Sequence, residues 1–129
     1  MATVKTFEDF EIWQMARALN KTIYKVTRRK IFNEDVDLRR QIRKASVSCM
    51  SNIAEGHERN NNNYFIQFLG IAKGSIGEVR SQLYSALDGE LIEETEFLPL
   101  KEEATTIGKK IGKLIDYLEQ HREATKLKR

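Results

Sequence analysis

Two carboxylates, Glu55 and Glu78, are the residues of this 129-residue chain whose surroundings best suit acid–base chemistry. Each lies on a polar line with helical spacing, which holds Ser48, Asn52, Glu55 and Arg59 in the first case and Ser75, Glu78 and Gln82 in the second. If the lines face each other, they form either a proton-transfer site or a hydrogen-bonded network that fixes the register of two helices. Because no metal, nucleophile or oxyanion site accompanies these carboxylates, we favour a structural network over a ligand or catalytic site. Its expected members are Ser48, Asn52, Glu55, Ser75 and Glu78.

The other chemically capable side chains form no catalytic or metal-binding pattern. Cys49 falls on the apolar side of an expected helix, where a buried structural thiol is more common than a nucleophile. His57 and His121 belong to no metal-ligand spacing, and the sequence lacks the Glu-x-x-His signature of di-iron bundles. It also lacks a glycine-rich phosphate loop. We therefore expect a protein that is not an enzyme and that uses no metal or cofactor.

Basic residues crowd one expected end of the fold. One run closes the first expected helix, another opens the second, and an antiparallel hairpin would bring the two together. Such a cluster could bind nucleic-acid phosphates with salt-dependent affinity, and a ring of subunits would multiply it. The alternative is a solvated surface offset by Glu34, Asp35 and Asp37. The candidate nucleic-acid-binding residues, one of which follows the second helix, are Arg28, Arg29, Lys30, Arg39, Arg40, Arg43, Lys44 and Arg59.

The elements that must position these residues are helices. Apolar residues recur at steps of three and four, which predicts helices over about residues 9–29, 37–56, 62–87 and 96–123. No segment shows the sustained alternation of a strand. Because short connections make sequential helices antiparallel neighbours, the sequence predicts an all-α fold. We expect an antiparallel up-down-up-down four-helix bundle that forms a single domain over residues 1–129.

A few residues set the expected helix ends. Residues 31–36 should form a loop, and the candidate N-caps of the second helix are Asn33, Asp35 and Asp37. Gly56 suits the left-handed C-terminal cap of that helix, and Asn61 suits the N-cap of the third. Pro99 is tolerable only in the first turn of the fourth helix, where its missing N–H costs no hydrogen bond.

Three glycines, Gly70, Gly74 and Gly77, lie inside the third expected helix. Each costs about 1 kcal/mol of helix stability relative to alanine. That cost predicts close packing at this helix, either inside the bundle or against another subunit.

Composition narrows the class of protein. The formal net charge of +3 indicates little about nucleic acid, and the single cysteine excludes an internal disulfide and suits a reducing compartment. No run approaches the ~20 apolar residues of a membrane span. The first ten residues carry acids and lack the apolar core of a signal peptide. We therefore expect a cytoplasmic protein without a membrane partner.

Four segments together resemble a known family. They are Phe7 to Arg17 (FEDFEIWQMAR), Gln41 to Ser48 (QIRKASVS), Ser51 to Gly56 (SNIAEG) and Phe65 to Glu78 (FIQFLGIAKGSIGE). In this order and over nearly the whole chain, they resemble the 23S ribosomal RNA intervening-sequence protein family, also called the four-helix-bundle protein family. The SNIAEG string is fairly specific, and the other segments are specific in combination.

The resemblance implies a bundle that assembles into a ring-like homo-oligomer, a pentamer, whose biochemical role is largely undefined. A related branch resembles the accessory protein of diversity-generating retroelements, a basic pentamer that binds nucleic acid and a reverse transcriptase. This chain departs from the common pattern after Gly56, where many members have Gly-Arg-Arg and this one has Glu58-Arg59-Asn60. The departure removes one cation, and the modest net charge fits the retroelement branch poorly.

Three functions remain open from the sequence. The first is a non-enzymatic oligomeric scaffold that binds structured RNA or DNA through the basic residues. The second is a protein–protein interaction module without nucleic acid, which would use the glycine-rich helix and exposed aromatic residues such as Trp13 and Tyr64. The third is an enzyme that uses Glu55 and Glu78. We favour the first.

Overall fold

The computed structural model describes the backbone of residues 4–127 and the side chains of residues 4–121, and within that range it is helical and contains no strand. One 3₁₀ turn, η1 (Phe7–Asp9), precedes five helices. These are α1 (Glu11–Thr27), α2 (Lys30–Asn33), α3 (Val36–Glu58), α4 (Asn62–Asp88) and α5 (Glu94–Leu127). The all-α prediction is confirmed, and the four long helices lie within a few residues of their expected bounds.

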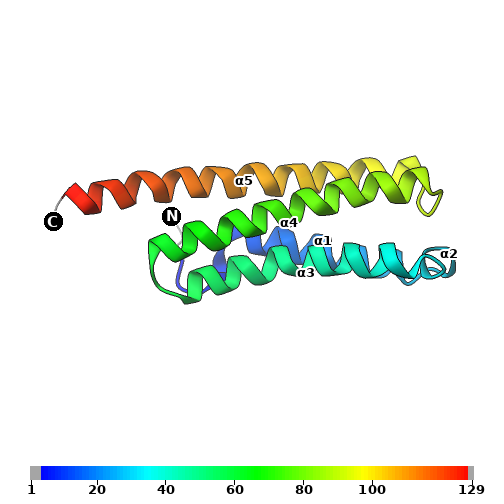
Figure 1. Cartoon of the computed structure of the whole chain (residues 1–129), viewed down its shortest axis with the longest axis horizontal. Coiled ribbons are helices and arrows are strands. Elements are labelled where there is room, and N and C mark those ends of the chain that lie inside the picture. The colour runs from blue at the N-terminus through cyan, green and yellow to red at the C-terminus, as the bar shows by residue number, and fades with distance from the viewer. Residues whose placement is uncertain (1–3, 128–129) are drawn as a thin grey trace.

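The four long helices pack as a bundle around a shared interior. Helix α1 packs against α3 and α5, α4 also packs against both α3 and α5, and the contact between α3 and α4 is the most extensive. Figure 1 shows the chain reversing direction at each connection, with α5 reaching beyond the other helices at its C-terminal end. Long helices that follow each other in the sequence are therefore neighbours in the bundle, and α1 and α5 close it.

A single apolar core holds the bundle together. Each expected apolar stripe turns inward, and Leu19, Ile53, Leu69 and Ile107 are among the side chains with no exposed surface. Burying one such side chain contributes roughly 1.5–3 kcal/mol relative to leaving it in water. With more than twenty apolar side chains in this cluster, core burial is the main favourable contribution to folding.

Two connections carry more structure than the sequence predicted. The expected loop at 31–36 contains the single turn α2, whose Phe32 is only 1% exposed and belongs to the core. A turn this short has no periodic pattern that would reveal it. Helix α5 begins at Glu94, so Pro99 lies in its second turn and the first-turn expectation was wrong. Pro99 has no N–H to donate to the carbonyl of Thr95. Because Thr95 is exposed, water can donate a hydrogen bond to that carbonyl instead.

Of the three N-cap candidates for α3, the structure selects Asp35; the expected cap of α4, Asn61, is confirmed, and the expected role of Gly56 was wrong. The Asp35 side chain accepts from the backbone N–H of Leu38 at 3.1 Å, and the Asn61 side chain accepts from the N–H groups of Asn63 and Tyr64. Helix α3, however, continues past Gly56 to Glu58. The left-handed residue in the α3–α4 connection is Asn60, with φ of 51°.

Gly56 instead permits close contact between α3 and α4. A Cβ atom at this position would lie 2.8 Å from Cβ of Phe68 and 3.0 Å from Cδ1 of Phe65. Real carbon atoms do not approach that closely, so any larger residue would push the two helices apart. The glycine is therefore required by packing, not by a turn.

Replacing Gly56 with alanine is expected to lower the free energy of unfolding by about 1–3 kcal/mol, because the added methyl group overpacks the α3–α4 contact. Urea denaturation followed by circular dichroism measures this change. The control is Ser51→Ala on the same helix, because this side chain is exposed and makes no hydrogen bond with a described residue. The control should leave stability unchanged or raise it by up to about 1 kcal/mol. Equal stability of the two variants would contradict the close contact.

Candidate nucleic-acid interface

Three of the five expected polar-network residues meet where α3 packs on α4. The hydroxyls of Ser48 and Ser75 are hydrogen-bonded at 2.8 Å, which joins the two helices. The Asn52 amide donates to the Ser48 carbonyl at 2.8 Å and to the Ser48 hydroxyl at 3.1 Å. Asn52 therefore reaches Ser75 only through Ser48. This short chain of hydrogen bonds fixes the axial register of α3 and α4.

The two carboxylates expected in this network lie outside it. Glu55 forms an ion pair with Arg59 at 3.7 Å one turn along α3, and its side chain is 53% exposed. Glu78 is exposed and borders a shallow depression near Lys44. From the Ser48–Ser75 contact, Glu55 is seven residues away along α3 and Glu78 three residues away in the opposite direction along α4. The carboxylates are thus separated by roughly 15 Å along the bundle, too far to act on one substrate atom.

Cys49 is a core residue, as its place in the sequence predicted. Its side chain has no exposed surface, and burial raises the pKa of the thiol to about 12. The thiol therefore stays protonated at neutral pH and is a poor nucleophile. Among the side chains of residues 4–121, no group of three or more His, Cys, Asp or Glu residues is arranged to hold a metal ion.

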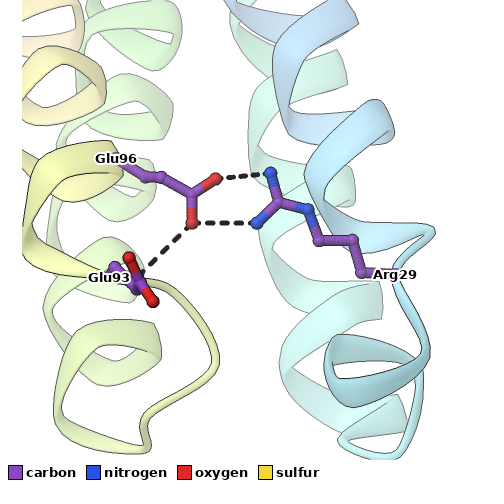
Figure 2. A network of polar contacts seen from close by, with 3 residues as sticks. All are labelled: Arg29, Glu93 and Glu96. Atoms are coloured by element: carbon purple, nitrogen blue, oxygen red, sulfur yellow. Dashed lines mark hydrogen bonds and ion pairs between the residues drawn. The ribbon is translucent and has the colours of Figure 1, made fainter.

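Arg29 is engaged in an ion pair that crosses the bundle. Its guanidinium binds the Glu96 carboxylate through two contacts, Nη1 to Oε1 at 2.8 Å and Nη2 to Oε2 (Figure 2). Glu96 Oε1 also accepts from the backbone N–H of Glu93 at 3.4 Å. The Arg29 hydrogen bond holds the pKa of Glu96 below its ordinary value of 4.5. The pair connects the end of α1 to the start of α5 and leaves Arg29 less available to a phosphate.

Arg43 and Arg59 also serve the fold. Arg43 donates from Nε to the Thr27 hydroxyl at 2.8 Å, and its guanidinium lies 4.5 Å from the centre of the Tyr24 ring. Arg43 therefore links α3 to α1. Arg59 lies over the rings of Tyr64 and Phe68 at 5.5 and 5.3 Å and pairs with Glu55.

Five of the eight candidate cations form no ion pair, side-chain hydrogen bond or ring contact with a described residue, and we call them the end cations: Arg28, Lys30, Arg39, Arg40 and Lys44. Arg39 is half-buried and the other four are exposed. The contact between Arg43 and Thr27 sets the end of α1 beside the first turns of α3, which places Arg28, Lys30, Arg39 and Arg40 near one end of the bundle and Lys44 one turn further along α3. The two basic runs therefore lie near each other, whereas Arg59 lies at the opposite end of α3, and the role of these cations in nucleic-acid binding stays a prediction.

Four further cations, which sequence reasoning missed, border a groove between α4 and α5: Lys73, Arg80, Lys109 and Lys113. Spacings of seven residues on α4 and four on α5 were the available signal, because they place each pair on one helix face. Of the two aromatic residues expected to be exposed, Tyr64 is 47% exposed. Trp13 is half-buried against Phe7, with ring centres 5.1 Å apart.

The comparisons with known proteins agree on the family and on the fold. A family model described as 23S rRNA-intervening sequence protein matches residues 8–113. No curated protein matches the sequence. A crystal structure of a protein of unknown function, from the S23 ribosomal protein family of Bacteroides thetaiotaomicron, is similar with a TM-score of 0.73 at 20% identity. The similarity covers 81% of this chain and 97% of that one. Within residues 4–127, no helix is both long and apolar enough to cross a membrane.

Replacing Glu96 with glutamine is expected to lower the free energy of unfolding at pH 7 by up to about 1 kcal/mol, because Arg29 loses its charged partner. The folded-state pKa of Glu96 lies below the unfolded value, so the pair contributes stability above about pH 4.5. That contribution disappears as pH falls through the folded-state pKa. Urea denaturation at pH 7 and at progressively lower pH should therefore show a difference between wild type and variant that is largest at pH 7 and shrinks as the pH falls below 4.5.

Glu94→Gln is the matched control, because Glu94 lies in the same turn of α5 and forms no ion pair with a described side chain. It should change stability little at any of these pH values. A wild-type advantage over Glu96→Gln that persists unchanged at low pH would contradict the assigned role of the ion pair.

Proposed function

The chain belongs to the 23S rRNA-intervening sequence protein family, and from that premise we propose that it is a non-enzymatic scaffold that self-associates and binds structured RNA or DNA through surface cations. The observation that carries the proposal is the group of five end cations, which have no partner among the described side chains and lie along the end of α1 and the first half of α3. A cation with no carboxylate partner of its own can displace the counterions of a nucleic acid, which is the main source of sequence-independent affinity. The wide separation of Glu55 and Glu78 supports the non-enzymatic part.

Self-association is supported by the outer face of α4. Gly70 and Gly74 lie there one turn apart, and a Cβ at each would meet no atom within 4 Å, whereas Gly77 lies toward α5. Packing within the chain therefore does not offset their cost to the helix. Ile71, 47% exposed, borders this pair of glycines. We propose that a second copy packs here in a ring-like homo-oligomer, a pentamer by the family resemblance.

The cysteine content, the net charge and the exposed apolar side chains bear on the cellular location and on further partners. The lone buried thiol suits the reducing cytoplasm, where we place the protein. A reverse transcriptase is the partner implied by the retroelement branch, and the net charge of +3 gives it less support. The second candidate function, a protein–protein module without nucleic acid, draws support from Leu98 and Tyr117, which are 52% and 55% exposed on α5.

Binding to RNA is expected to weaken about tenfold when Arg40 and Lys44 are both replaced with alanine, because both are exposed end cations one turn apart on α3. The slope of log affinity against log salt should fall by about 2. Fluorescence anisotropy with a labelled RNA hairpin, measured over a range of KCl concentrations, gives both numbers. Arg43 is left intact because it fastens α3 to α1.

The matched control removes two exposed cations elsewhere, Lys5 and Lys21, and should change the affinity by no more than about twofold. Absence of wild-type binding to RNA and DNA at low salt would refute the nucleic-acid part of the proposal. Recovery of one protein partner in the same preparation would then favour the protein–protein module.

Replacing Gly74 with leucine is expected to reduce the molar mass measured by light scattering toward that of the 15.0 kDa monomer, because the new side chain would occupy the contact face. Circular dichroism should show an unchanged fold, since the position has open space within the chain. Ala18→Leu, at an exposed position on α1, is the control and should keep the wild-type mass. A Gly74→Leu variant with the wild-type mass would rule out this face.

A further inference from the structure

An open groove of about 470 Å³ runs between α4 and α5, and none of the end cations lines it. Its floor includes Ile76 and three glycines, Gly77, Gly108 and Gly112. A Cβ at Gly108 would lie 3.5 Å from Cγ2 of Ile76, and one at Gly77 would meet no atom within 4 Å. The groove therefore exists because glycines line positions where longer side chains would fill it.

The walls of the groove are cationic on both sides. Lys73 and Arg80 border it on α4, and Lys109 and Lys113 border it on α5. All four are exposed, and none forms an ion pair with another described side chain. The neighbouring Lys110 differs, because it pairs with Glu11 of α1 and does not line the groove.

The charge in this groove is large for the chain that carries it. Asp116 is the one acid among the groove's lining residues, so the lining has a formal charge of +3, the same as the whole chain. At the end cations, by contrast, Glu34, Asp35 and Asp37 lie close by in the sequence. The groove is thus a concentrated site of positive potential on a nearly balanced protein.

The arrangement of the cations fits a chain of phosphates and not a single anion. Lys73 and Arg80 are two turns apart on α4, and Lys109 and Lys113 are one turn apart on α5, so the four span on the order of 10 Å of groove. About three consecutive phosphates of one nucleic-acid strand occupy that length of duplex axis. An open cationic groove that follows the backbone is a recurring way to hold nucleic acid without reading its sequence.

We propose that the α4–α5 groove binds the phosphate backbone of a nucleic acid, in addition to the end cations. The inference rests on the proposed nucleic-acid function and assigns it a second site. The groove lining contains no aromatic side chain, so the bases have nothing to stack on and binding is independent of sequence. It also offers no large exposed apolar side chain to anchor an acidic helix, which favours a nucleic acid over an acidic protein segment.

The test compares four double variants with wild type, using anisotropy of a labelled 20-nucleotide RNA, single-stranded and as a duplex. Lys109→Ala with Lys113→Ala, and Lys73→Ala with Arg80→Ala, should each weaken binding about tenfold and lower the salt slope by about 1.5–2. The control, Lys5→Ala with Lys21→Ala, removes the same charge elsewhere and should bind within about twofold of wild type. Lys109→Arg with Lys113→Arg keeps the charge and should bind like wild type.

The outcomes separate the groove from the end cations. If the groove variants bind like wild type while Arg40→Ala with Lys44→Ala does not, the groove inference is overturned and the proposed function stands. Loss of binding in the arginine variant would also overturn it, because the charge is intact there. Wild-type protein that binds neither RNA form at low salt overturns both proposals. Binding of a poly-glutamate peptide as tightly as RNA, abolished in the groove variants, would reassign the groove to acidic proteins.

Discussion

The contact between α3 and α4 is the constraint on which the rest of the structure depends. Gly56 lets the two helices approach until Phe65 and Phe68 touch its backbone, and the Ser48–Ser75 hydrogen bond sets their relative height. Leu69 has no exposed surface, as expected of a residue on the inward face of α4. With that face used inside the bundle, the glycine-rich outer face and the edge beside α5 remain available to other molecules. A single packing geometry thus accounts for both proposed surfaces of α4.

The parts of the fold that depend on local sequence were predictable. The apolar stripes predicted four long helices, and short polar side chains before them limited the N-cap of α3 to three candidates, including Asp35, and indicated Asn61 for α4. The parts that depend on a distant neighbour were not. Gly56 was predicted to end a helix, because the sequence does not show that Phe68 packs against it. Phe32 was predicted to lie in a loop, because a single helical turn is too short to show a periodic apolar pattern.

The same distinction applies to the candidate site. The sequence shows how many basic residues there are, but whether a basic side chain is available to a ligand depends on the acidic or polar side chains that the fold places beside it. Arg29 proved to be opposite Glu96, 67 residues further along the chain, and Arg43 opposite the hydroxyl of Thr27. The groove cations were missed for the converse reason, since they are scattered along α4 and α5 and only the packing of these helices brings them together. Three of the five expected network residues meet, because Ser48 and Asn52 share one face of α3 and Ser75 of α4 lies opposite Ser48.

The packing of Trp13 makes its indole ring an optical reporter of one particular event. It is the single tryptophan of the chain, and it rests edge-on against Phe7 of η1, with the Arg17 guanidinium 5.8 Å from its ring centre. Its emission will therefore respond to undocking of the N-terminal 3₁₀ turn, whereas helical ellipticity follows the bundle as a whole. A difference between the two transitions would reveal that the N-terminal segment opens before the core does.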